Sequence, residues 1–62
     1  MDTIRTLREA KEMTQADLAS AIGVTQTTIA RYESGERTPG IFVAQKIARA
    51  LNCTLDDLLH EK

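Results

Sequence analysis

Residues 15–34 constrain the fold more than any other part of the chain, because they predict two short helices joined by a glycine turn. Gly23 can adopt the left-handed conformation that ends a helix, and Thr25 can cap the start of the next one. The apolar residues that recur at helical spacing on the two segments are Leu18, Ala19, Ile22, Ile29 and Tyr32. Such packing holds the second helix rigidly on the outside of a small domain, as in proteins that place a helix in the major groove of DNA.

The outward face of the second helix carries side chains suited to DNA. At about 100° per residue, Thr27 and Arg31 point away from the apolar face, and Gln26 lies at the exposed helix start. Arginine can donate two hydrogen bonds to guanine, glutamine can pair with adenine, and threonine offers a hydroxyl and a methyl group. We therefore predict that these three residues contact bases. The alternative is an ordinary solvated helix face.

Length and composition limit the possible functions. A chain of 62 residues has room for one domain, so we expect residues 1–62 to form a single unit. No apolar run approaches the ~20 residues that span a membrane and no signal peptide is visible, which predicts a cytoplasmic protein. A lone cysteine, Cys53, gives neither an internal disulfide nor metal-ligand spacing. Catalytic pairs and phosphate loops are also missing, so we expect no enzymatic activity, cofactor, metal or small-molecule ligand.

The net charge of −1 is unusual for a nucleic-acid binder, because such domains are generally basic. Residues 1–49 contain seven Lys or Arg and six Asp or Glu, whereas residues 50–62 contain three acidic residues and one lysine. The acidity therefore lies at the C-terminus, away from the predicted groove helix. Weak non-specific DNA binding is the expected consequence.

The hydrophobic pattern is helical along the whole chain. We expect helices at residues 3–11, between a start after Thr14 and the turn at Gly23, at residues 26–33, at residues 41–51, and from Thr54 to about Leu59. Gly35 and Asn52 are suited to left-handed caps after the third and fourth helices. The predicted buried stripe of the fourth helix contains Ile41, Ala44, Ile47, Ala48 and Leu51. Five short helices with short connections predict a compact all-α domain.

Five motifs follow one another in the order and spacing of a known family. They are T-Q-A-D-L-A at residues 14–19, I-G-V-T at 22–25, Y-E-S-G-E-R-T-P at 32–39, K-I-A-R-A-L at 46–51 and T-L-D-D-L-L at 54–59. With this set, the chain resembles a Cro/repressor-type helix-turn-helix domain, of the kind found in lambdoid phage repressors and xenobiotic-response-element regulators. The resemblance covers residues 4–59. It implies a five-helix, lambda-repressor-like DNA-binding domain with its helix-turn-helix at helices two and three.

The resemblance also implies roles for individual residues. Gln15 matches a position that holds a DNA phosphate and braces the first residue of the recognition helix, here Gln26. Thr27 and Arg31 match the positions that most often read bases. The further matches to DNA-backbone contacts are Thr28, Arg37 and Thr38.

Four other positions bear on the resemblance. Arg8 and Glu33 match a pair that forms an internal salt bridge between the first and third helices. Glu12 stands where relatives often have glycine, so either a left-handed residue there costs about 1 kcal/mol or the junction is wound differently. Phe42 stands at a usually polar position. It either contacts a partner surface, such as a second subunit, or folds back over Pro39.

Together these features predict a sequence-specific DNA-binding transcriptional regulator, a repressor rather than an activator. One such domain contacts few bases, so we expect a homodimer on a near-palindromic site in double-stranded DNA. The predicted dimer interface comprises Phe42, Leu55 and Leu59. Two alternatives keep the same fold. One is a protein-interaction module with weak or no DNA binding, which the negative charge favours, and the other is an antitoxin-like protein that binds both DNA and a protein.

Overall fold

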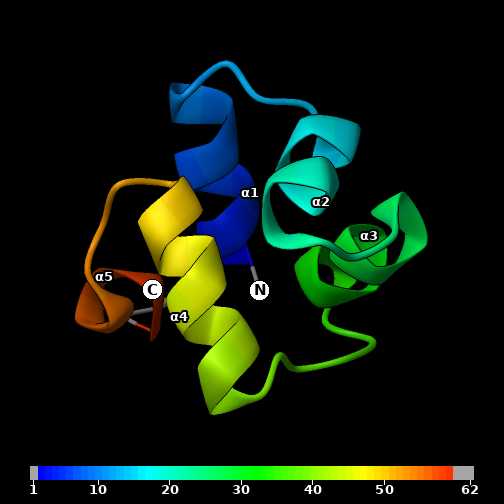
Figure 1. Cartoon of the computed structure of the whole chain (residues 1–62). Coiled ribbons are helices and arrows are strands. Elements are labelled where there is room, and N and C mark those ends of the chain that lie inside the picture. The colour runs from blue at the N-terminus through cyan, green and yellow to red at the C-terminus, as the bar shows by residue number, and fades with distance from the viewer. Residues whose placement is uncertain (1, 60–62) are drawn as a thin grey trace.

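The part of the protein that the structure describes is a bundle of five short helices. The computed structural model describes residues 2–59, and the side chains of residues 3–58. Its helices are α1 (Asp2–Ala10), α2 (Gln15–Ile22), α3 (Gln26–Ser34), α4 (Ile41–Ala50) and α5 (Leu55–Leu59) (Figure 1). Over the described residues the chain contains helices and their connections without any strand, which confirms the predicted all-α fold.

Local hydrogen bonds fix the start of α2 and the start of α3, on either side of the turn at Gly23. Thr14 caps α2 through a capping box: its hydroxyl accepts the Asp17 N–H at 3.0 Å, and its own N–H donates to the Asp17 carboxylate at 2.9 Å. Gly23 ends α2 in the left-handed conformation, with a φ of 76°. Thr25 then caps α3 by accepting the Thr28 N–H at 3.2 Å. The predicted start and stop signals therefore form as expected.

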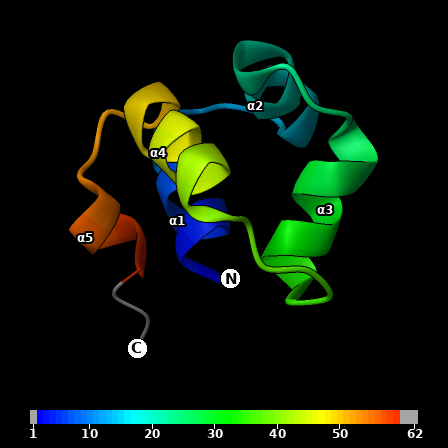
Figure 2. The same cartoon turned by 60° about the horizontal axis from the view of Figure 1, so that its bottom comes forward.

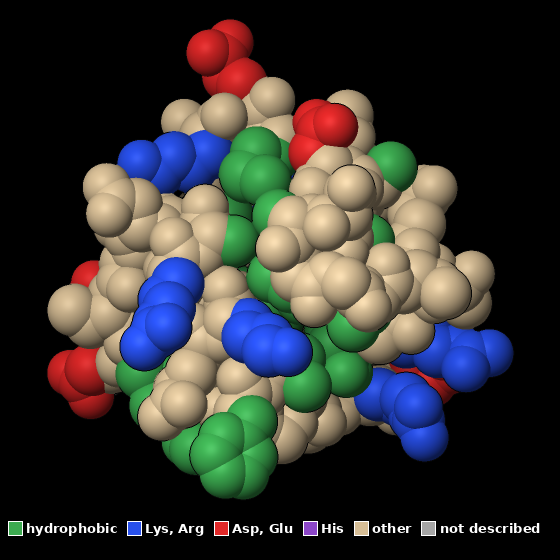
Figure 3. Space-filling model, viewed as in Figure 1, with side chains coloured by type: hydrophobic (Ala, Val, Ile, Leu, Met, Phe, Trp, Pro, Cys, Tyr) green, Lys and Arg blue, Asp and Glu red, His purple; other side chains and the backbone are tan. Residues whose placement is uncertain are grey.

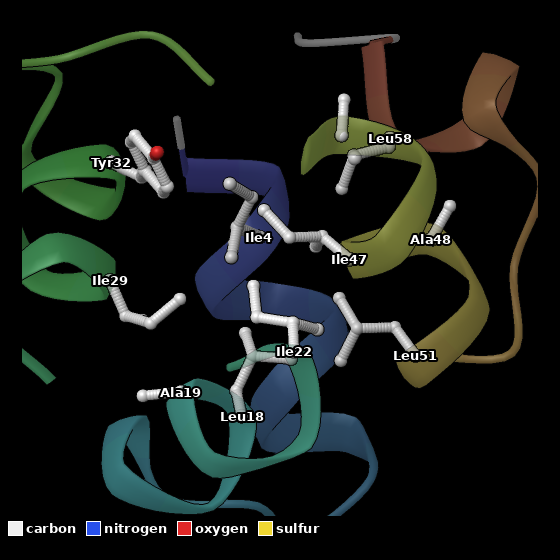
Figure 4. Close-up of a cluster of buried hydrophobic side chains, with 11 residues drawn as sticks. Ile4, Leu18, Ala19, Ile22, Ile29, Tyr32, Ile47, Ala48, Leu51 and Leu58 are labelled. Atoms are coloured by element: carbon white, nitrogen blue, oxygen red, sulfur yellow. The ribbon is translucent and has the colours of Figure 1, made fainter. Parts of the chain in front are cut away.

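One apolar core joins the helices (Figure 4). Its buried members are Ile4, Leu18, Ala19, Ile22, Ile29, Tyr32, Ala44, Ile47, Ala48, Leu51 and Leu58. All the apolar residues predicted for the inner faces of α2 and α3 belong to it. Each fully buried Ile or Leu contributes roughly 1.5–3 kcal/mol, so this core supplies most of the favourable free energy of folding.

Ile41 is an exception to the predicted stripe of α4. It is 54% exposed, so the prediction that it is buried is wrong. Ile41 is the first residue of α4, and in Figure 1 the first turn of this helix extends past the ends of α1 and α2. No helix covers that turn. Helical periodicity predicts the direction of a side chain, but not whether another element packs over it.

Left-handed residues follow each of the first four helices. Gly35 has a φ of 84°, and Asn52, as predicted, has a φ of 54°. Glu12 has a φ of 56°, so of the two alternatives for this junction the structure shows the left-handed one. A residue with a Cβ atom is strained there by about 1 kcal/mol. The predicted helix ends are otherwise close, since α1 and α4 each end one residue earlier than expected.

The packing order leaves one face of α3 open to solvent. α2 packs against both α3 and α4, while α1 packs against α3 and α5. Figures 1 and 2 accordingly show α3 at one side of the molecule, with α4 and α5 at the other. None of the described helices is long and apolar enough to cross a membrane.

Candidate nucleic-acid interface

The outward face of α3 is polar and exposed. Ile29 and Tyr32 hold the opposite face in the core. Gln26, Thr27 and Arg31 are all exposed, in the directions that the helical pattern predicts. Thr27 and Arg31 lie one turn apart, so their side chains are neighbours on the helix surface. The position of these residues is thus established, and their contact with bases stays a prediction.

Two threonines fix the first turn of α3. The hydroxyl groups of Thr25 and Thr28 lie 2.8 Å apart, and either can donate the hydrogen bond. Thr28 is half-buried, and its hydroxyl still has capacity for one more partner, such as a phosphate oxygen. Gln26 and Thr27 lie between these two residues. The cap therefore sets the backbone position of the first two exposed residues of α3.

A buried ion pair joins α3 to α1. Arg8 Nε donates to Glu33 Oε2 at 2.7 Å, and Arg8 Nη2 donates to Glu33 Oε1 at 3.2 Å. The two side chains are 10% and 5% exposed. Arg8 Nη1 also donates to the Met13 carbonyl oxygen at 2.6 Å, which ties down the connection before α2. The structure thus places Arg8 and Glu33 in the salt bridge that the resemblance implies.

Gln15 reaches the same ion pair from the start of α2. Its Nε2 donates to Glu33 Oε1 at 3.1 Å. Within the hydrogen bonds of the described side chains, Gln15 is not joined to Gln26, so the brace that the resemblance implies does not form here. Hydrogen bonds to an ionised carboxylate are stronger than those to a neutral amide, which explains why the Gln15 amide turns toward Glu33.

The contacts of Glu33 keep it ionised. Burial by itself raises the pKa of the Glu33 carboxyl, but the hydrogen bonds from Arg8 and Gln15 bring this pKa below its ordinary value. The hydrogen bond to Glu33 likewise raises the pKa of the Arg8 guanidinium. Both groups therefore stay charged near neutral pH. Removing either one would leave an unpaired charge in the interior.

The loop after α3, residues 35–40, is tied to the end of that helix. The Arg37 N–H donates to the Arg31 carbonyl at 3.2 Å, and the Glu36 N–H donates to the Ser34 hydroxyl at 3.3 Å. Arg31 Nε also lies 3.1 Å from Glu36 Oε2, in an ion pair whose side chains are 51% and 64% exposed. Arg31, Glu36 and Arg37 thus form a charged corner at the end of α3.

The predicted DNA-contacting residues come from segments on one side of the molecule. In Figure 1 the start of α2, all of α3 and the loop after α3 lie on the right-hand side. Arg37 and Thr38 are exposed in that loop, and Gln15 is half-buried at the start of α2. The residues predicted to contact the DNA backbone therefore lie before and after α3 in the chain.

The predicted dimer residues differ in their surroundings. Phe42 is 77% exposed on α4, so most of its side chain faces solvent and does not pack over Pro39. Leu55 is partly buried and packs against the core, so little of it is left for a partner. Leu59 belongs to α5, but its side chain lies outside the described part of the chain. Of the three, Phe42 is the residue that the structure places on an open surface.

Sequence reasoning missed three charged residues. Glu36 pairs with Arg31 because the left-handed Gly35 reverses the chain after α3, and no helical spacing predicts that contact. Lys46 and Arg49 are exposed on α4, and neither takes part in the ion pairs found between described residues. Lys46 and Arg49 are three residues apart and do not belong to the buried stripe of α4. This spacing is the sequence signal that predicts them together on its outer face.

The described side chains contain no group of His, Cys, Asp and Glu that could hold a metal ion. Cys53 is half-buried. Burial, together with the nearby charge of Asp57, raises the pKa of its thiol above the ordinary value. The thiol is therefore protonated near neutral pH, and the thiolate is the reactive form of cysteine.

Comparison with known proteins identifies the family. The chain matches the family model described as "Helix-turn-helix" over residues 4–58. It is 42% identical over 55 residues to an uncharacterized HTH-type transcriptional regulator of Archaeoglobus fulgidus, which covers 89% of this chain and 79% of that protein. It is 43% identical over 51 residues to the cryptic phage CTXphi transcriptional repressor RstR of Vibrio cholerae, which covers 82% of this chain and 46% of RstR.

A solved structure shows the same arrangement of helices. The P22 c2 repressor, crystallised in complex with a synthetic operator, aligns with a TM-score of 0.90 and 30% sequence identity. The alignment covers 98% of this chain and 92% of the repressor chain. Family model, sequence relatives and fold therefore agree with the motifs. The chain belongs to the Cro/repressor-type helix-turn-helix family of transcriptional regulators.

Proposed function

We propose that the protein binds specific sites in double-stranded DNA as a homodimer and represses transcription from them. The observation that carries this proposal is the exposed polar face of α3, which a capped turn and the buried Ile29 and Tyr32 hold rigidly outside the core. The P22 c2 repressor, which has this fold, was crystallised on an operator. In this geometry α3 enters the major groove and presents its first residues to base edges.

Three residues of α3 are assigned to base recognition. Arg31 can donate two parallel hydrogen bonds to guanine, and Gln26 can both donate to and accept from adenine. Thr27 lies between them on the exposed face, where its methyl group can contact a thymine methyl. Each good contact of this kind distinguishes the correct base by about 1–3 kcal/mol.

The contacts to the DNA backbone come from both ends of the helix-turn-helix. At the start of α2, Gln15 and the free backbone N–H groups of the first turn face a phosphate, which the helix dipole also attracts. Thr28 contacts the same strand from α3. After α3, Arg37 and Thr38 contact a further phosphate from the exposed loop. Such contacts position the helix but carry no sequence information.

The charge distribution should make non-specific binding to DNA weak. Arg31 is paired with Glu36, and the whole chain has a net charge of −1. Phosphate attraction supplies most of the non-specific affinity for DNA, and here few unpaired cations are available for it. The protein must therefore obtain its affinity from base contacts and from dimerisation.

The dimer interface is assigned to the first turn of α4. Ile41 and Phe42 are adjacent there, and they are 54% and 77% exposed. Two neighbouring apolar side chains on an uncovered turn are suited to a two-fold contact with a second copy. Leu55 packs against the core and leaves little surface for this contact, so Ile41 and Phe42 carry it. A dimer would place two copies of α3 on half-sites about one helical turn apart.

Repression follows from occupancy, because a dimer bound at a promoter excludes other proteins from the same DNA. RstR and the P22 c2 protein, both similar to this chain, are named as repressors. The family assignment does not favour an interaction module that has lost DNA binding. A reporter gene placed behind the selected site would test the direction of regulation, since repression requires the signal to fall when the protein is expressed.

The first experiment is selection of bound sequences from a random duplex library at low salt. We expect enrichment of a site with two-fold symmetry, whose half-sites contain the guanine that Arg31 contacts. An asymmetric enriched site would contradict the dimer, and no enrichment at all would contradict sequence-specific binding. The Phe42→Ser variant, studied by analytical ultracentrifugation with and without the selected site, then tests the interface. It should sediment as a monomer where the unmodified protein is a dimer.

A further inference from the structure

A hollow lies between α2 and α4, on the side of α4 that faces away from α5. Its volume is about 460 Å³, and it is lined by Ala21, Ile22, Lys46, Arg49 and Ala50. Figure 3 shows it as a recessed strip of hydrophobic side chains, with Lys and Arg side chains beside it. The two alanines leave the floor shallow and open. An apolar side chain from another molecule could therefore enter it without displacing any residue of the protein.

None of the ion pairs between described residues neutralises the cations at this hollow. Lys46 and Arg49 are exposed, and the ion pairs between described residues join Arg5 to Glu9, Arg8 to Glu33 and Arg31 to Glu36. Because Lys46 and Arg49 are three residues apart on a helix, their charged ends lie on the same side of the hollow. This surface thus combines an apolar floor with two adjacent unpaired positive charges.

The hollow is separate from the proposed DNA-binding side. It lies between α2 and α4, whereas the charged corner is formed by the end of α3 and the loop after it. α4 approaches that side only at its N-terminus, through the loop after α3. Lys46 and Arg49 occupy the second half of α4. A molecule bound in the hollow would leave α3 free to occupy a major groove.

We propose that this hollow binds an acidic amphipathic helix of a partner protein. One large apolar side chain of that helix would enter the space over Ala21, Ile22 and Ala50. Carboxylates on the neighbouring turn would pair with Lys46 and Arg49. Grooves that accept one face of a helix commonly use an apolar anchor of this kind, and charges at the rim select the partner and speed association.

Charge and shape select this occupant over others. Small-molecule sites enclose most of their ligand, whereas this hollow is open along its length (Figure 3). A DNA strand would bring phosphates to Lys46 and Arg49, but it would leave the apolar floor unfilled. An acidic amphipathic helix would fill the apolar floor with a side chain and pair its carboxylates with the two cations.

A phage-displayed library of random peptides, selected against the full chain, tests this proposal. We expect the enriched peptides to share one large apolar residue flanked by Asp or Glu. A synthetic peptide with that sequence should shift the backbone amide resonances of residues 21, 22, 46, 49 and 50. The Lys46→Glu/Arg49→Glu variant should bind it about tenfold more weakly, since two rim contacts are reversed. Arg5→Glu, a charge-reversal control on α1, should bind it normally.

Several results would overturn the proposal. No enrichment, enriched peptides without carboxylates, or amide shifts confined to α3 would each do so. Displacement of the peptide by non-specific duplex DNA would show that phosphate is the ligand of Lys46 and Arg49 instead. Because the shifts are mapped on the unmodified protein, the test does not depend on the folding of the double variant. It also needs no operator, so its outcome is independent of the proposed DNA binding.

Discussion

The two faces of α3 carry the same kind of ion pair in different surroundings. On the inner face Glu33 pairs with Arg8, and both side chains are almost completely buried. At the outer end Arg31 pairs with Glu36, and both side chains are more than half exposed. Water competes strongly for the outer pair and scarcely reaches the inner one. The comparison shows that burial, rather than the identity of the charged groups, decides which pair belongs to the fold and which remains available to a ligand.

Breaking the inner pair should have the largest effect. Arg8→Met leaves Glu33 buried without its charged partner, which should cost about 3 kcal/mol of unfolding free energy. Domains of this size have only about 3–5 kcal/mol in total, so the variant should keep at most about 2 kcal/mol and unfold at a much lower urea concentration. Urea denaturation followed by circular dichroism measures the loss.

The matched control for that variant is Arg5→Met, which removes the exposed pair between Arg5 and Glu9 on the same helix. Exposed pairs contribute little, so its cost should stay below about 0.5 kcal/mol. Equal losses in Arg8→Met and Arg5→Met would refute the distinction between a structural and an available ion pair.

Removing the outer arginine should affect DNA binding instead of stability. Arg31→Ala should weaken binding to the selected site by about 1–3 kcal/mol, because the contact to guanine is lost. Its unfolding free energy should change by less than about 0.5 kcal/mol. Fluorescence anisotropy with a labelled duplex measures the affinity, and Arg5→Ala serves as a charge-matched control. A loss of affinity in both variants would mean that Arg31 contributes only net charge.

Lowering the pH should weaken the buried ion pair between Arg8 and Glu33. Since the pKa of Glu33 is lowered in the folded state, this carboxylate stabilises the fold at pH values above its unfolded pKa of about 4.3. That contribution is lost as the pH falls through the folded pKa. We expect the urea midpoint to fall between about pH 5 and pH 3. Asp17, whose pKa is lowered by hydrogen bonds from Thr14, adds to the fall. Glu33→Gln leaves Arg8 buried without this carboxylate, so it should lower the urea midpoint at neutral pH and remove most of the pH dependence. An unchanged dependence would contradict the role of Glu33.

Neutralising Glu36 should have the smallest effect, and it should raise the affinity for DNA instead of lowering it. Glu36→Gln frees Arg31 and removes a negative charge close to the phosphates, so DNA affinity should rise about threefold. Glu9→Gln changes the net charge equally but lies on α1, and it isolates the local effect. A lower affinity in Glu36→Gln would show instead that Glu36 orients Arg31 for its base.

The fold could be read almost entirely from the sequence because its determinants are local. Capping by Thr14 and Thr25 and the stop at Gly23 depend on residues within one turn of each other. Inward directions follow from the helical repeat. The error at Ile41 marks the limit, because coverage depends on where the first turn of α4 lies relative to other helices.

The residues of the candidate site could be predicted from the sequence, but their ion pairs and hydrogen bonds could not. The exposed direction of Thr27 and Arg31 follows from the helical repeat alone. The contact between Arg31 and Glu36 depends on the path of the chain after Gly35, and the contact of Gln15 with Glu33 joins residues far apart in the sequence. Helical periodicity contains no information on such contacts, so they could be found only from the folded structure.

The helix ends also affect how relatives of this protein can be recognised. The chain turns left-handed after four helices, and it uses glycine at Gly23 and Gly35 but asparagine at Asn52 and glutamate at Glu12. The strain of about 1 kcal/mol at the last of these is small beside the contribution of the core. The fold therefore tolerates a residue other than glycine at these turns. A homologue search that requires glycine at each turn would overlook chains like this one, whereas a search for the pattern of buried residues would find them.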